Sequence, residues 1–409
     1  MKRFVSFHFL FAIFFSACLF LNSCSDREEP TATVPEARGK VLSVELKESF
    51  NVEQVAAYMN SYSPIVASLF PPQHPVDLYK VVYETLDADD NITIASGIIA
   101  VPVGLNSNLP LASYQHGTIF SKDGAPSNGS TEQLIAIGMA SNGGYVTQIA
   151  DYIGLGVSPG LHPYHHARTE ATAVIDMLRA ARQVCADKDI PLSDDLFLFG
   201  YSQGGHATMA VHQYIETYYS DEFTVTGSAP MEGAYDISGT QTDILLSGEP
   251  YPAPYYLPYL LISYNNVYKM YPTLADALRE DWYNLLAPML SDNVTYSDGN
   301  IDAVMPDIPI EIIKPEVLTA FQTDPEHPLR KALYDNDTYR WIPKSKMRLF
   351  HCDADKHVDF GNAQVAYDYF QEQGATNVEL VMPLAGGTHE TCVIVCLVQG
   401  KAWFDELRQ

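Results

Sequence analysis

A serine stands between glycines in the segment GYSQGG, residues 200–205, which fits the pattern G-x-S-x-G. The apolar residues LFLF precede the segment as a strand would, and HATMAVHQYI follows it with the spacing of a helix. A strand that turns sharply into a helix needs glycine on both sides of the serine, because larger side chains would collide there. The segment therefore predicts a nucleophile, Ser202, displayed at the tip of a strand-to-helix turn.

A serine hydroxyl becomes a useful nucleophile when a histidine accepts its proton and a carboxylate orients that histidine. Sites on a strand-to-helix turn carry these residues in the chain order serine, acid, histidine. Asp355 lies in the middle of the loop in LFHCDADKHVDF, and His389 lies in LAGGTHETC, each after a β-rich run. We therefore predict Asp355 as the acid and His389 as the base, with Asp353 as the alternative acid.

Acyl transfer also needs N–H donors for the oxyanion that develops on the substrate. The backbone N–H of Gln203, the residue after the nucleophile, is expected to be one donor. The loop YQHGT is expected to supply the second, and we choose the N–H of Thr118 because Gly117 permits close approach of the backbone. His116 precedes the serine in the chain, and we interpret it as bracing this loop. The predicted chemistry requires no metal and no cofactor.

The elements that must position these residues alternate along the chain. The β-rich runs 76–86 and 92–103 predict a hairpin, and an amphipathic pattern predicts a long helix over 166–187. Residues 41–70 contain the pattern of one or two helices. Strands and helices alternate after the hairpin, which predicts an α/β fold with a mostly parallel sheet and helices on both faces. Residues 240–340, rich in Pro and Tyr, interrupt this alternation and are predicted to be an inserted cap.

Several motifs together resemble the α/β-hydrolase superfamily, and more narrowly its exported bacterial esterase and lipase branch near the secretory lipases. These motifs are, in chain order, YQHGT, DYIGLG, HPYHHARTEATAVIDMLRAAR, GYSQGGHA, HCDADKHV and GTHE. The resemblance covers about residues 75–405. It implies an eight-stranded sheet with a cap, and a catalytic triad at Ser202, Asp355 and His389. Cys352 departs from the pattern, because relatives usually carry glycine at this place.

The N-terminus predicts export. Basic residues precede a long apolar run that ends in LNSC, so residues 1–23 resemble the signal peptide of a lipoprotein, with Cys24 as the lipid-modified first residue. An uncleaved anchor helix, or cleavage after Ala17, is the alternative. The acidic segment SDREEP after Cys24 resembles the surface-export signal of some Gram-negative lipoproteins. We therefore predict an outer-membrane lipoprotein that is exposed on the cell surface and held to the membrane through Cys24.

The remaining chain divides into a tether and a hydrolase. Residues 24–39 are predicted to be a flexible tether, and residues 40–239 and 341–409 are predicted to be the α/β-hydrolase core around the cap at 240–340. Disulfides persist in exported proteins. Cys352 could bridge to Cys392 or to Cys396, because all three lie near candidate catalytic residues, and the sequence does not determine the pairing.

The formal net charge of −26 repels phosphate backbones, so we expect no nucleic-acid partner. We predict a serine hydrolase that cleaves carboxylic esters through an acyl-enzyme on Ser202, with a small-molecule or glycan-linked ester as its substrate. The alternatives are a serine exopeptidase of the same fold and a non-catalytic, glycan-binding surface lipoprotein. The acyl chain, the alcohol and the oligomeric state are not predicted.

Overall fold

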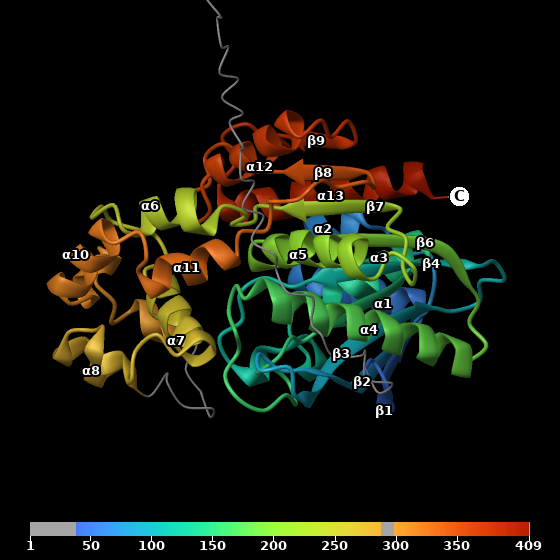
Figure 1. The fold of residues 1–409 in the computed structure, drawn as a ribbon. Helices are drawn as coiled ribbons and strands as arrows, with labels where there is room; N and C mark the ends of the chain where they lie inside the picture. The colour runs from blue at the N-terminus through green and yellow to red at the C-terminus, as the bar shows by residue number, and fades with distance from the viewer. Residues whose placement is uncertain (1–37, 288–297, 409) are drawn as a thin grey trace, which may run out of the picture. The chain divides into compact units, whose positions relative to one another are not determined.

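Nine strands form one sheet within residues 38–287 and 298–408, which the computed structural model describes, in the order β1-β2-β3-β5-β4-β6-β7-β8-β9 (Figure 1). Pairing is antiparallel from β1 through β3 to β5 and parallel across the rest of the sheet. The strands are β1 (Val41–Phe50), β2 (Val76–Leu86), β3 (Ile92–Pro102), β4 (Leu109–Gln115), β5 (Val146–Ala150), β6 (Leu192–Tyr201), β7 (Gly227–Met231), β8 (Met347–Phe350) and β9 (Val378–Val381). The mostly parallel α/β class predicted from the sequence is therefore confirmed.

The strand β1 corrects the sequence prediction, which expected eight strands and recognised only a helical pattern in residues 41–70. The helical pattern is confirmed in α1 (Val52–Tyr62) and α2 (Pro64–Leu69), but the ten residues before them pair antiparallel with β2. Leu42, Val44 and Leu46 alternate with polar residues there, which is the period of a strand. β1 is an edge strand whose side chains are mostly exposed, so its apolar signal was weak.

Helices cover both faces of the sheet. Val174 and Leu178 of α4 and Val211 of α5 pack with the side chains of β2 and β3 on one face. Val55 of α1 and Phe404 of α13 pack on the other face, together with residues of α3. The helices outside the cap are α1, α2, α3 (Gln133–Gly143), α4 (Ala167–Asp187), α5 (Gln203–Tyr218), α12 (Gly361–Glu372) and α13 (His389–Leu407).

A helical cap is inserted between β7 and β8, where the Pro- and Tyr-rich segment interrupts the alternation. Its helices are α6 (Thr242–Leu245), α7 (Tyr256–Tyr268), α8 (Glu280–Leu286), α9 (Asp298–Asp302), α10 (Pro315–Thr323) and α11 (Pro328–Asp335). They share an apolar cluster that includes Leu260, Ile312 and Leu333. The arrows of β7 and β8 point toward the cap in Figure 1, so the cap lies at the carboxyl ends of these strands.

The predicted signal peptide at 1–23, the lipidation site Cys24 and nearly all of the tether 24–39 lie outside the described residues. Among the residues that are described, no helix has both the length and the apolar character needed to cross a bilayer.

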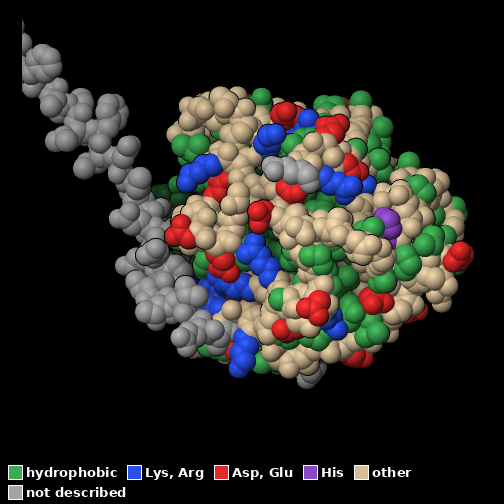
Figure 2. Space-filling view, turned by 90° about the vertical axis from the view of Figure 1, so that its right-hand side faces the viewer, with side chains coloured by type: hydrophobic (Ala, Val, Ile, Leu, Met, Phe, Trp, Pro, Cys, Tyr) green, Lys and Arg blue, Asp and Glu red, His purple; other side chains and the backbone are tan. Residues whose placement is uncertain are grey.

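Figure 2 shows the surface on the side away from the cap, where basic side chains lie next to acidic ones.

Candidate active site

The predicted nucleophile lies at a tight turn between β6 and α5. Ser202 has φ 61° and ψ −121°, a conformation that few residues other than glycine adopt. Glycines next to it let neighbouring strands approach: a Cβ on Gly204 would lie 1.9 Å from the carbonyl oxygen of Gln115, and one on Gly205 would lie 2.2 Å from that of Met231. The N–H of Ser202 donates to the Met231 carbonyl at 3.0 Å, which ties the turn to the end of β7.

The structure brings the three predicted triad residues together. Nε2 of His389 lies 2.9 Å from Oγ of Ser202, and Nδ1 of His389 lies 2.6 Å from Oδ2 of Asp355. His389 is the first residue of α13, whereas Asp355 lies in the loop after β8. Because an ionised carboxylate only accepts hydrogen bonds, Nδ1–H of His389 donates to Asp355, and its Nε2 remains free to accept the serine proton.

The Asp355 carboxylate is buried but well supplied with donors. Its Oδ1 accepts the backbone N–H of His357 at 2.7 Å and that of Val358 at 2.9 Å. Burial alone would raise the pKa of Asp355, but the hydrogen bonds from His389, Glu232 and the backbone outweigh burial and hold this pKa well below its usual range. Asp355 therefore carries a negative charge beside His389.

The alternatives from the sequence lie elsewhere. Asp353 is exposed, and its Oδ1 accepts the backbone N–H of Gly386 at 2.6 Å, so it holds a loop. His116 is buried with its ring nitrogens facing the carbonyl oxygens of Gly117 and Asp151. Neither residue contacts His389 or Ser202 through a described hydrogen bond.

The two predicted oxyanion donors belong to backbone segments beside Ser202. Gln203 is the first residue of α5, where an N–H has no acceptor within the helix. The loop after β4 passes close to the nucleophile, since a Cβ on Gly117 would lie 3.9 Å from Cβ of Ser202. Thr118 follows directly, and its hydroxyl lies 3.1 Å from that of Tyr164.

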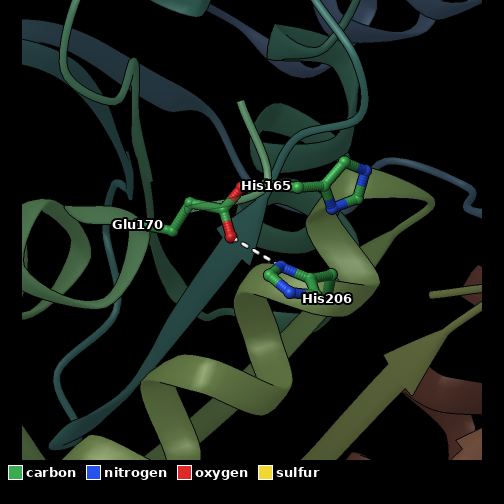
Figure 3. Close-up of side chains that lie close together, drawn as sticks. All are labelled: His165, Glu170 and His206. Atoms are coloured by element: carbon green, nitrogen blue, oxygen red, sulfur yellow. Dashed lines mark hydrogen bonds and ion pairs between the residues drawn. The ribbon is translucent and has the colours of Figure 1, made fainter. Parts of the chain in front are cut away.

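A buried ion pair joins Glu170 of α4 to His206 of α5, which lies four residues after Ser202 in the chain, and the sequence analysis missed it (Figure 3). Nδ1 of His206 lies 2.8 Å from Oε2 of Glu170, and Nε2 of His206 lies 2.9 Å from the carbonyl oxygen of Asn336. Both partners are acceptors, so both ring nitrogens of His206 donate and the ring is a cation. The other oxygen of Glu170 accepts Nε2–H of Gln203 at 2.8 Å, which anchors the side chain of the predicted oxyanion residue.

The pair is stable because each charge compensates the other. Burial alone would lower the pKa of His206, but the Glu170 carboxylate and the Asn336 carbonyl outweigh it and raise this pKa. Burial alone would raise the pKa of Glu170, but His206, His165 and Gln203 outweigh it and lower this pKa to about 2. The pair therefore joins the first turn of α5 to the start of α4.

Aromatic side chains extend from the cap to the site. Tyr259 of α7 stacks on Tyr164 with ring centroids 4.3 Å apart, and Tyr256 approaches His357 at 6.1 Å. His357 in turn stacks on His389 at 5.0 Å, with the rings nearly parallel. The Tyr-rich segment of the cap therefore packs against the residues beside His389.

A disulfide joins the loop after β8, which contains Asp355 and is called the acid loop below, to α13, which begins at His389. Cys352 bonds to Cys392, which settles the pairing that the sequence left open in favour of Cys392 over Cys396. Cys352 lies three positions before Asp355, and Cys392 lies three positions after His389. Cys396 is a buried free thiol whose Sγ lies 3.5 Å from that of Cys392.

The described residues contain three groups whose potential metal-ligand atoms lie within 4.8 Å of one another: His165, Glu170 and His206; Glu232, Cys392 and Cys396; and Glu232, Asp355 and His389. Other bonds already use these atoms: the first group contains the ion pair, the second a disulfide sulfur and the third the contact between His389 and Asp355. A metal ion could bind there only after these bonds were broken. The arrangement favours acid–base chemistry.

The sequence analysis did not single out Glu170, His206 or Glu232. Glu170 and His206 stand inside quoted motifs, HARTE and GGHA, but neither motif indicates that the two side chains meet. Glu232 directly follows β7 at the same edge of the sheet as the site, where parallel sheets place functional groups. A carboxylate at that edge could have been proposed from the segment APMEG.

Residues 127–406 of the chain match the family described as secretory lipase. None of the curated proteins matches its sequence. The solved structures include similar folds, among them the rice cell wall degrading esterase LipA from Xanthomonas oryzae, at 26% identity and a TM-score of 0.80, covering 91% of this chain and 100% of LipA.

Two further structures extend the comparison. A protein of Legionella pneumophila described as a hydrolase shares 26% identity at a TM-score of 0.82, covering 90% of this chain and 98% of its own. Candida antarctica lipase A shares the fold at 17% identity and a TM-score of 0.69, covering 91% of this chain and 83% of its own. Together these structures place the chain in the α/β-hydrolase fold.

Removing the disulfide should destabilise the protein. The double substitution Cys352→Ser with Cys392→Ser should lower the free energy of unfolding by about 3 to 4 kcal/mol, because it removes a cross-link over a sequence separation of 40. Urea unfolding without reductant measures this change. Cys396→Ala leaves the cross-link in place and should lower the free energy by about 1 kcal/mol. Equal losses in the two variants would contradict the pairing.

Proposed function

The chain belongs to the secretory lipase family and is a carboxylic-ester hydrolase, and from this premise we propose that it cleaves its substrate through an acyl-enzyme on Ser202. The observation that supports this proposal most is the continuous contact from Asp355 through His389 to Ser202, at 2.6 and 2.9 Å. An oriented histidine of this kind is what a serine nucleophile requires.

Acylation begins when Oγ of Ser202 attacks the ester carbonyl carbon while Nε2 of His389 accepts the hydroxyl proton. The carbonyl oxygen becomes an oxyanion, which the backbone N–H groups of Gln203 and Thr118 would stabilise. The negative charge of Asp355 stabilises the imidazolium that forms. When the tetrahedral intermediate collapses, the bond to the alcohol breaks and His389 gives its proton to the departing oxygen.

Deacylation repeats these steps with water. His389 accepts a proton from the water molecule, whose oxygen attacks the acyl carbon, and the second oxyanion occupies the same donors. Collapse then breaks the bond to Ser202, and His389 returns the proton to the serine oxygen. The products are a carboxylic acid and an alcohol, and the enzyme regains its starting protonation state.

For the substrate we propose a small-molecule or glycan-linked ester. The partly exposed ring of Tyr256, 6.1 Å from that of His357, offers an aromatic surface beside the site, which suits an acyl or aromatic acid group. The buried ring of Tyr164 packs against Tyr256, and Tyr259 stacks on Tyr164. LipA, which has a similar fold, is described as degrading rice cell walls, and this supports a glycan-linked ester. Membership in a lipase family favours esters over the peptides of an exopeptidase.

For the location we propose an outer-membrane lipoprotein that is exposed on the cell surface. The family is named for secretion, which agrees with export of this chain. The anchor would be a lipid on Cys24, since LNSC ends a basic and then apolar leader. We propose no nucleic-acid partner, because the net charge is −26.

Replacing the nucleophile should abolish turnover. Ser202→Ala should reduce kcat on p-nitrophenyl esters by about 10⁴-fold or more and should prevent labelling by a fluorophosphonate, because the hydroxyl that would form the acyl-enzyme is lost. Ser193→Ala, at the opposite end of β6, serves as the matched control and should keep wild-type activity. Substantial turnover or labelling in the Ser202 variant would contradict the proposal. If the protein were instead a non-catalytic glycan-binding protein, even the wild type would not react with the fluorophosphonate.

The acid can be identified by comparing two neighbouring aspartates. Asp355→Asn should reduce kcat by about 10⁴-fold, because an amide cannot hold the histidine in the required tautomer or stabilise its charge. Asp353→Asn should change kcat by less than about threefold, because its carboxylate is exposed and binds only the loop at Gly386. Steady-state kinetics on one ester measures both. The reverse order would transfer the acid role to Asp353.

The anchor can be tested by cell fractionation. Cys24→Ser should move the protein from the membrane fraction to the soluble fraction, because the residue that would carry the lipid is lost. Cys18→Ser, inside the predicted signal peptide, is the control and should leave fractionation unchanged. A Cys24 variant that stays with the membranes would end the lipoprotein proposal.

A further inference from the structure

A second buried carboxyl group, that of Glu232, lies beside the acid of the proposed triad. Glu232 follows directly after β7 and has φ 49°, which is unfavourable for a residue with a side chain. Its backbone N–H donates to the carbonyl oxygen of Phe350 at 2.9 Å. Its Oε1 accepts the backbone N–H of Cys352 at 2.7 Å. The end of β7 is thereby fixed to the start of the acid loop.

The other oxygen of Glu232 has no donor. Oε2 is buried and accepts no hydrogen bond, and carboxyl oxygens of Glu232 and Asp355 lie within 4.8 Å of each other. The bond that suits this arrangement runs between the two carboxyl groups, and burial together with this bond raises the pKa of Glu232. Two carboxyl groups can share such a bond only when one of them holds a proton. Asp355 already accepts hydrogen bonds from His389 and from two backbone N–H groups, all of which favour its ionised form. The proton therefore resides on Glu232.

The alternative is that Glu232 is ionised and paired with a charged His351, whose Nε2 lies 3.2 Å from Oε2. His351 is a poor candidate for a cation. Its Nε2–H already donates to the carbonyl oxygen of Val358 at 2.8 Å, and its Nδ1 has no hydrogen-bond partner, so a second proton would be buried without an acceptor. Burial lowers the pKa of His351. A neutral His351 leaves an ionised Glu232 uncompensated.

The other titratable groups near Glu232 are Asp355, His389, Tyr201, Tyr235 and Cys396, which come from the acid loop, the end of β6, the segment after β7, and α13. His389 is the one base among them, and its Nδ1–H already donates to Asp355 rather than to Glu232. Burial, together with the neighbouring Asp355 carboxylate, raises the pKa of Glu232 to about 11. The direction of this shift agrees with a protonated, neutral Glu232.

We propose that Glu232 is a positioning residue of the active site, whose protonated carboxyl donates a hydrogen bond to Asp355 and holds this carboxylate toward His389. The proposal rests on the triad proposed above. Glu232 does not touch the substrate, and its proton does not leave during turnover. It acts through Asp355, which would otherwise be fixed only by its own loop and by His389.

The experiment compares a variant that keeps the donor with one that loses it. Glu232→Gln replaces the O–H by an N–H and keeps an oxygen for the N–H of Cys352, so kcat on a p-nitrophenyl ester should stay within about threefold of wild type. Glu232→Ala should reduce kcat by about ten- to a hundredfold with little change in KM, because one hydrogen bond to a charged group is lost. A Gln variant as impaired as the Ala variant would overturn the proposal.

Infrared difference spectroscopy detects directly whether the carboxyl group of Glu232 is protonated. Wild type minus Glu232→Gln at pH 8 should show the C=O stretch of a protonated carboxyl group. Glu379→Gln is the matched control, because Glu379 is exposed and paired with Arg348, and it should show only a carboxylate band. A carboxylate band for Glu232 would overturn the proposal even if the Ala variant did not fold.

The spectrum does not depend on turnover. In the Ser202→Ala background the band should persist, so its absence would reject the proton on Glu232 while leaving the nucleophile proposal intact. Conversely, a wild-type protein that neither turns over esters nor reacts with a fluorophosphonate would reject the proposed function, whatever the spectrum shows.

Discussion

The hydrogen bond between Ser202 and His389 joins residues 187 positions apart, and the rest of the site depends on it. Parallel strands bring it about, because β6, β8 and β9 run in the same direction and end at one edge of the sheet. A helix that packs on the sheet follows each of these strands: α5 after β6, α12 after β8 and α13 after β9. Ser202 directly precedes α5 and His389 begins α13, so the packing of these two helices on the sheet also sets the geometry of the site.

Histidines compensate the buried carboxylates Glu170 and Asp355, and a proton neutralises the carboxyl group of Glu232 in the arrangement we infer. Among the described residues, Glu170 pairs with His206 and Asp355 with His389, and neither carboxylate has a lysine or arginine partner. A buried charge without a partner is strongly unfavourable, so the site allows few protonation patterns. In the pattern we infer, His206 is charged, Asp355 is ionised and Glu232 is neutral. In the proposed mechanism, Asp355 is then the buried negative charge that would stabilise the imidazolium of His389 after it accepts the serine proton.

The sequence predicts the parts of this site that follow from local pattern and chain order. Ser202 is recognisable from its glycines and its flanking strand and helix, and Asp355 and His389 follow β-rich runs in the required order. The strand β1 was missed because an exposed edge strand has a weak apolar signal. The pairing of Cys352 with Cys392 depends on which side of α13 faces the acid loop, which no local pattern records. The roles of Glu170 and Glu232 depend in the same way on partners distant in the chain.

We propose that Ser202 becomes acylated while two backbone N–H groups stabilise the developing oxyanion. A crystal structure of the protein after reaction with a p-nitrophenyl alkylphosphonate would show whether this is so. We expect phosphorus bonded to Oγ of Ser202, with the phosphoryl oxygen accepting the N–H groups of Gln203 and Thr118 and with Nε2 of His389 within hydrogen-bond distance of the adduct. An unmodified Ser202, or phosphorus on another residue, would contradict it.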